Sequence, residues 1–209
     1  MTHEKYSGVY PVSKRVIHAK RKIIPQADRI IAVSENTKRD ILQYFPDTDP
    51  AKISVIYHGA SMTPKGNEPS PLQCEYVLFV GHRGMYKNFS RFTEAMKQIM
   101  TAHKNIHVFC AGGGKFTPEE VSSFGEFSPR FHQSGLNDDE LAGAYENALC
   151  FVFPSEYEGF GIPVLEAFAC DCPVICANAS SLPEVASESA LYFDPLSVEG
   201  YERENITSD

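Results

Sequence analysis

The sequence predicts an α/β protein built on a doubly wound, Rossmann-like parallel sheet. Two observations support this class. Short apolar runs alternate along the chain with longer amphipathic stretches, which is typical of repeated strand–helix units. From residue 76 onward the short runs are apolar throughout, as expected for strands that are covered on both faces. In such sheets ligands bind beyond the carboxyl ends of the strands, so residues that directly follow a strand are the candidates for function.

The expected elements follow in chain order. Residues 29–33 read as a strand, Ser34 offers an N-cap to a helix over 37–45, and 53–56 read as a second strand. Residues 59–71 are rich in Gly, Pro and polar side chains and form the expected linker. Beyond the linker the pattern predicts strands at 76–80, 106–111, 131–133, 149–153, 173–176 and 191–193, and helices at 89–101, 117–124, 138–147, 162–169 and 183–186.

Composition and charge narrow the function classes. The chain has 209 residues, of which 43% are hydrophobic and 22% charged, as in an ordinary globular protein. Its net charge of −8 argues against nucleic acid as a partner, although residues 1–45 carry +5 and the remainder −13. There is no apolar run of membrane-spanning length and no secretory signal, so we expect a cytoplasmic protein.

The cysteines do not predict a metal site. Cys170, Cys172 and Cys176 are not spaced as a CxxC pair, and no histidine lies nearby in the sequence. Most of the six cysteines fall inside or beside apolar runs, so we expect buried free thiols and no bound metal.

The first two candidate sites each follow a strand. Gly81, His82, Arg83 and Lys87 follow the strand at 76–80, where two cations at the mouth of the sheet suit a diphosphate. The other interpretation is a basic surface loop, and for His82 a sugar or phosphate contact and a simple loop role both stay open. Residues 112–114 are three glycines after the next strand, and they predict either a phosphate- or sugar-binding turn or a tight connection.

The third candidate site follows the strand at 149–153 and contains two acids. Glu158 and Glu166 are separated by seven residues, and Gly161 lies at the start of the predicted helix between them. The unpaired N–H groups of that helix start suit an anion. Glu166 lies about one turn further in, where a carboxylate can accept hydrogen bonds from a ribose diol. Either acid alone is also explained as a solvated charge.

The block from Glu158 to Glu166 resembles the Glu-x7-Glu motif of retaining glycosyltransferases of family 4, which have the GT-B fold of two Rossmann-like domains. Five further segments resemble that family in the same order, at residues 27–34, 81–88, 135–141, 181–185 and 192–195. The resemblance implies that this chain holds the C-terminal half of a GT-B fold. It divides the chain into three segments. Residues 1–58 are the incomplete tail of the N-terminal acceptor domain, residues 59–71 are the linker, and residues 72–209 are a donor-binding domain that is short at its C-terminus.

The resemblance also implies residue roles. Glu166 binds the donor ribose, and Glu158 lies beside the transferred sugar and its phosphate. Arg83 and Lys87 neutralise the leaving diphosphate without a metal ion. The remaining donor-binding positions are the backbone of Leu136 at the nucleobase, the N–H groups of Phe160, Gly161 and Ile162, and the neighbouring Gly81, His82, Gly112, Gly113 and Leu165.

The function so implied is transfer of a hexose, with retention, from a nucleotide-diphosphate sugar to a glycan or lipid-linked acceptor, without a cofactor. The loop at 81–88 favours mannose from GDP-mannose, with a UDP-linked donor as the other choice. The alternatives are a nucleotide-sugar-binding fragment without turnover and a GT-B epimerase acting on a UDP-sugar, for which no suitable set of acids and histidine is present. We also expect peripheral contact with the inner membrane face, and homodimers through the apolar surface where a missing half-domain would dock.

Overall fold

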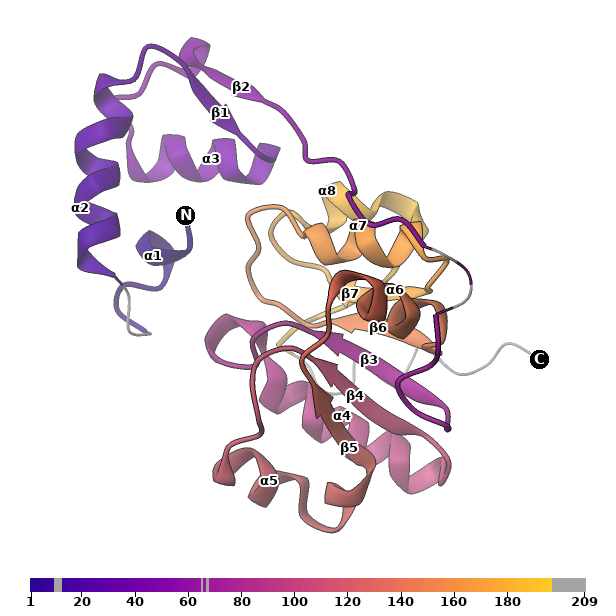
Figure 1. Cartoon of the computed structure of the whole chain (residues 1–209). Helices are drawn as coiled ribbons and strands as arrows, with labels where there is room; N and C mark the ends of the chain where they lie inside the picture. The colour runs from indigo at the N-terminus through magenta and orange to yellow at the C-terminus, as the bar shows by residue number, and fades with distance from the viewer. Residues whose placement is uncertain (10–12, 65, 67, 197–209) are drawn as a thin grey trace.

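The computed structural model describes residues 1–9, 13–64, 66 and 68–196. The predicted α/β class is confirmed, because strands and helices alternate through most of these residues (Figure 1). The strands are β1 (Ile30–Ala32), β2 (Ile53–Val55), β3 (Tyr76–Val80), β4 (His107–Ala111), β5 (Phe131–Ser134), β6 (Cys150–Phe153), β7 (Val174–Ala177) and β8 (Leu191–Phe193). The α-helices are α1 (Thr2–Lys5), α2 (Lys14–Ile23), α3 (Glu35–Tyr44), α4 (Phe89–Ala102), α5 (Pro118–Phe124), α6 (Asp138–Glu146), α7 (Ile162–Ala169) and α8 (Leu182–Ala186).

Strands β3 to β8 form one parallel sheet in the order β5-β4-β3-β6-β7-β8. After β3 the chain adds β4 and β5 on one side of that strand. It then crosses back and adds β6, β7 and β8 on the other side. Right-handed crossovers then place α4 and α5 on one face of the sheet and α6, α7 and α8 on the other (Figure 1). The reversal creates a topological switch point beyond the carboxyl ends of β3 and β6.

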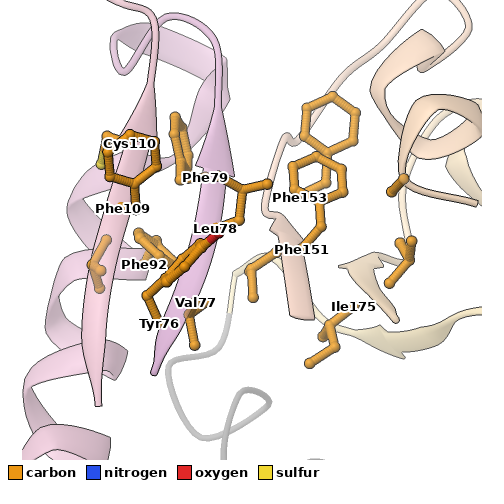
Figure 2. Close-up of a cluster of buried hydrophobic side chains, with 14 of the residues drawn as sticks. Tyr76, Val77, Leu78, Phe79, Phe92, Phe109, Cys110, Phe151, Phe153 and Ile175 are labelled. Carbon is orange, nitrogen blue, oxygen red and sulfur yellow. The ribbon is translucent and has the colours of Figure 1, made fainter. Parts of the chain in front are cut away.

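The main core lies between this sheet and its helices. Figure 2 shows apolar side chains from β3, β4 and β6 packed together with Phe92 of α4. The Phe79 ring centroid lies 5.0 Å from that of Phe89 and 5.4 Å from that of Phe92. The fully apolar strands are thus explained by helix cover on the sheet.

The N-terminal residues form a smaller unit around the two-stranded parallel sheet of β1 and β2. Its core is Ala32, Ile41 and Ile53, with α3 packed on the sheet. The sequence analysis did not predict α1 or α2. Helix α1 has only four residues, and α2 is dominated by Lys and Arg, although its few apolar residues, Val16, Ile17 and Ile23, do recur at helical spacing. The described residues between 59 and 71 form no helix or strand, and residues 197–209 of the expected donor domain lie outside the described part.

Local sequence explains where the helices begin. Thr117 and Asn137 each cap a helix through a capping box with the glutamate three residues on, at the starts of α5 and α6. Helix α7 begins after Gly161, whose φ of 109° disfavours a side chain. A Cβ there would also lie 2.9 Å from Cδ2 of Leu182, so this glycine lets α7 start close to α8.

Candidate donor site

The switch point brings together one cation and one acid from the two halves of the sheet. Lys87 ends the short 3-10 helix Met85–Lys87 after β3, and Glu158 lies in the loop after β6. The Lys87 Nζ atom lies 2.6 Å from Oε1 of Glu158, and the two side chains are only 17% and 14% exposed. The ammonium also lies 5.0 Å from the ring centroid of Phe153. This is a largely desolvated ion pair at the edge where α/β sheets bind ligands.

Hydroxyl groups hold the loop that carries Glu158. Ser180 accepts a hydrogen bond from the Glu158 N–H at 2.7 Å, and its hydroxyl lies 2.9 Å from the Glu158 carbonyl oxygen. The Ser181 hydroxyl lies 3.0 Å from the same carbonyl oxygen and 2.8 Å from that of Phe160. Both serines directly follow β7, so they reach the loop from the neighbouring strand.

The N–H groups of this loop point to the side opposite its carbonyl groups. In a trans peptide the C=O and N–H bonds are antiparallel, so a carbonyl held on one side turns the next N–H to the opposite side. Among the residues that the structure describes, the N–H groups of Phe160, Gly161 and Ile162 donate no hydrogen bond. Unpaired N–H groups at a helix start can receive an anion or hydroxyl oxygens.

Glu166 lies further along α7 in a half-buried position. The Tyr145 hydroxyl donates a hydrogen bond to Oε2 of Glu166 at 3.2 Å. Burial raises the pKa of Glu166, while the hydrogen bond from Tyr145 acts in the opposite direction. Burial and the adjacent carboxylate raise the pKa of Tyr145, which therefore stays a neutral donor. A pocket of about 270 Å³ adjoins Glu166 and is lined by Ser61, Met62, Thr63, Asp138, Asp139 and Glu166.

Arg83 is placed differently from Lys87, although both follow β3. Its side chain is only 4% exposed and pairs with Glu120 of α5 at 2.8 Å. Its terminal nitrogens each lie 3.0 Å from a carbonyl oxygen in the glycine-rich turn after β4, those of Gly112, Gly114 and Lys115. The structure therefore directs this guanidinium into the protein and does not bring it to the Lys87–Glu158 pair.

The glycines of the first two predicted sites make room for that arrangement. A Cβ on Gly113 would lie 2.6 Å from Nη1 of Arg83 and 2.7 Å from the Gly81 carbonyl oxygen. Gly81 and Gly112 both have positive φ and donate their N–H groups to the ends of neighbouring strands. His82 is exposed on the same loop, while Leu136 and Leu165 are partly buried beside α6 and within α7.

The sequence also predicts buried free thiols, no bound metal and no membrane-spanning segment. Within residues 1–9, 13–64, 66 and 68–196, no group of three or more His, Cys, Asp or Glu side chains is arranged to hold a metal ion. Burial raises the pKa of the Cys172 and Cys176 thiols to about 12, and Cys170 is also buried. No helix in that part of the chain is long and apolar enough to cross a membrane.

Sequence reasoning missed the residues that support the site. Tyr145 gives no signal because it lies inside an amphipathic helix, like any core aromatic residue. Ser180 and Ser181 could have been found, because they follow a strand at the same sheet edge as Glu158.

A doubly wound parallel sheet with an ion pair and a helix start at its switch point defines a Rossmann-like domain with a candidate ligand site. Comparison with known families agrees: the model of the glycosyl transferases group 1 family matches residues 65–204, and that of glycosyltransferase family 4 matches residues 2–63. The chain belongs to the group 1 glycosyltransferase family.

Several named proteins are similar to the chain. It is 50% identical over 196 residues to the O-antigen chain mannosyltransferase B of Escherichia coli, covering 84% of this chain and 50% of that protein. It is 43% identical over 196 residues to the serotype-specific mannosyltransferase WbdA of E. coli, covering 85% and 24%. The chain thus spans half or less of these two relatives.

Solved structures agree on the fold. The glycosyltransferase WaaG, involved in lipopolysaccharide biosynthesis, matches with a TM-score of 0.71 at 19% identity, over 96% of this chain and 61% of that one. A glycosyltransferase from Rickettsia africae matches with a TM-score of 0.70 at 19% identity, over 92% and 56%. At this identity the likeness shows the fold alone.

Proposed function

We propose that the chain forms the donor half of a retaining mannosyltransferase that uses GDP-mannose. The observation that carries the proposal is the Lys87–Glu158 pair at the switch point, where the Glu158 loop has N–H groups at Phe160, Gly161 and Ile162 with no acceptor among the described residues. The mannosyltransferase names of the 50% and 43% identical relatives support mannose over other hexoses. The two family matches meet at residues 63–65, inside the linker 59–71, which supports the division into 1–58 and 72–209.

The residues divide the chemistry between them. The bond from the sugar's anomeric carbon to the diphosphate oxygen breaks, the bond to the acceptor oxygen forms, and the acceptor hydroxyl passes its proton to the departing diphosphate. Lys87 and the amides of Phe160, Gly161 and Ile162 stabilise the charge that builds on the leaving diphosphate, without requiring a metal ion. Glu158 lies beside the sugar, and Glu166 binds the ribose.

The other predicted residues take supporting places around the same donor. Leu136 presents its backbone to the nucleobase, Leu165 lines the helix beside Glu166, and His82 contacts the diphosphate from its exposed loop position. We assign Arg83, with Gly81, Gly112 and Gly113, to positioning the turns that carry these groups, since its donors all face the protein.

The acceptor is a glycan or a lipid-linked glycan in this proposal, reached from the inner membrane face. Helix α2 supports a peripheral contact, because Lys14, Arg15, Arg21 and Lys22 are exposed on it and the helix contains no acid. Exposed Ile31 on β1, 65% accessible, marks the apolar edge through which a second copy would associate. Sedimentation with and without anionic vesicles tests both contacts.

Donor binding is tested by calorimetric titration with GDP, UDP and GDP-mannose, in EDTA and in Mg²⁺. Glu166→Gln removes a charged acceptor, so we expect GDP affinity to fall by about 10- to 150-fold, the equivalent of one charge-assisted hydrogen bond. Glu94→Gln changes an exposed carboxylate on α4 and should leave the affinity unchanged. Equal binding by wild type and Glu166→Gln would refute the ribose role.

The pH dependence gives an independent readout. Because the pKa of Glu166 is raised, its carboxylate gains a proton at a higher pH than an ordinary glutamate. GDP binding by the wild type should therefore weaken as pH falls through that raised pKa, and this step should be absent in Glu166→Gln. Donor binding with no transfer or donor hydrolysis would favour the alternative of a nucleotide-sugar-binding fragment.

A further inference from the structure

Helix α3 of the N-terminal unit lies against the loop that carries Glu158. Ser34, Thr37 and Asp40 are spaced three residues apart and so share one side of this helix. Asp40 accepts a hydrogen bond from the hydroxyl of Tyr157, the residue before Glu158. Ile41 packs in the core of the β1–β2 unit. Helix α3 therefore joins the N-terminal unit to the candidate donor loop.

Two hydroxyl groups of α3 converge on a single carbonyl of that loop. The Ser34 Oγ atom lies 2.7 Å from the Gly159 carbonyl oxygen, and Thr37 Oγ1 lies 2.9 Å from it. Ser34 is fully buried and also accepts the Thr37 N–H at 2.9 Å as the N-cap of α3. Each hydroxyl has one proton and the carbonyl has two lone pairs, so all these bonds can form at once.

The contact is held from the other direction by Glu184 of α8. Its carboxylate accepts the N–H groups of Glu35 at 2.5 Å and Asn36 at 3.1 Å. These are the first two N–H groups of α3, which have no partner inside the helix. An acid of the donor domain thus caps the helix whose hydroxyls bind the donor loop.

The carbonyls of residues 158, 159 and 160 are therefore all held by hydroxyl groups, the first from Ser180, the second from α3 and the third from Ser181. Fixing the Gly159 carbonyl fixes the direction of the Phe160 N–H in the same peptide plane. That N–H is one of the groups proposed to bind the donor.

We infer that Ser34 and Thr37 are positioning residues for the donor loop, acting through the Gly159 carbonyl. The inference rests on the proposed donor site but goes beyond it, since it makes donor affinity depend on side chains outside the donor domain. The N-terminal unit then contributes to donor binding as well as to the acceptor side.

The test uses the full chain with Thr37→Val, Ser34→Gly and both changes together. Valine keeps the shape of threonine without its hydroxyl, and glycine at an N-cap costs the helix only a few tenths of a kcal/mol relative to serine. Thr101→Val is the matched control, because Thr101 bonds only within α4. Melting temperatures establish that the variants are folded.

Two measurements decide the inference. In calorimetric titration, GDP-mannose should bind the double variant at least about tenfold more weakly than the wild type, as expected for two lost hydrogen bonds. NMR order parameters for the amides of residues 159–161 should fall from the rigid range of about 0.85 toward 0.6 without any ligand. Thr101→Val should change neither quantity.

The outcomes separate this inference from the proposed function. Unchanged order parameters in a folded double variant would overturn the inference. If the wild type binds GDP-mannose, equal affinity in the double variant would overturn it as well. A wild type that binds no nucleotide sugar would refute the proposed function, whereas the order parameters would still decide whether α3 positions the loop.

Discussion

Replacement of Arg83 by methionine tests whether this guanidinium serves the fold. The change removes an ion pair with Glu120 and three hydrogen bonds to carbonyl oxygens, all in a site that is 4% exposed. Removing one partner of a buried pair costs about 3–5 kcal/mol. For a chain of this length each kcal/mol lowers the melting temperature by about 2–4 °C, so we expect a fall of about 6–20 °C.

The comparison that gives the experiment its meaning is Lys87→Met in the same loop. Lys87 makes one ion pair, whereas Arg83 makes an ion pair and three further hydrogen bonds, so loss of Lys87 should cost less, about 1.5–3 kcal/mol, and lower the melting temperature by about 3–12 °C. Differential scanning calorimetry measures both variants, and titration with GDP-mannose follows at a temperature where both are folded. Arg83→Met that melts within 2 °C of wild type yet binds no donor would refute the reasoning, because the guanidinium would then act on the ligand.

Two further predictions concern the glycine turn and the buried thiols. Gly113→Ala should destabilise the protein by several degrees in a melting scan, whereas Gly114→Ala, also at positive φ but facing open space, should cost less; equal losses would exclude the clash with Arg83. Burial raises the pKa of five thiols above the ordinary 9.0, most strongly for four of them. The folded state therefore keeps protons that the unfolded chain releases, and stability present below pH 9 is lost as pH rises toward 12. At pH 10 each of these four thiols should lower the free energy of unfolding by about 1.4 kcal/mol, roughly 6 kcal/mol together. Urea unfolding under reducing conditions at pH 8 and pH 10 should show this loss, and an unchanged midpoint would contradict it. These thiols are Cys110, Cys150, Cys172 and Cys176.

The sheet was predictable because its signal is local. Each strand is a continuous apolar run and each following helix has its own cap, so burial and boundaries can be read from neighbouring residues. The placement of Lys87 opposite Glu158 also follows, since both come directly after strands that adjoin at the switch point.

The inward orientation of the Arg83 side chain could not be predicted from the sequence of its loop. Its partners are a turn and a helix about 30 residues away, and only the packing of α5 on the sheet brings Glu120 within reach. Only one of the two roles of Ser34 was predictable from the sequence. Its N-cap position is a local signal, whereas its hydrogen bond to Gly159 joins residues 125 positions apart. Long-range polar contacts depend on tertiary geometry, which periodicity does not encode.

Because of the sheet order, the site residues come from two separate stretches of the sequence. Everything that faces Glu158 from the β3 side, including Lys87, is encoded before the loop that joins β5 to α6, whereas Glu158, Gly161 and Glu166 are encoded after it. Neither stretch holds both Lys87 and Glu158. Recombination between relatives near residue 136 therefore keeps the Lys87–Glu158 pair only when each parent brings its own member in the same register, and it must also preserve the contacts of α3 with Gly159 and Glu184.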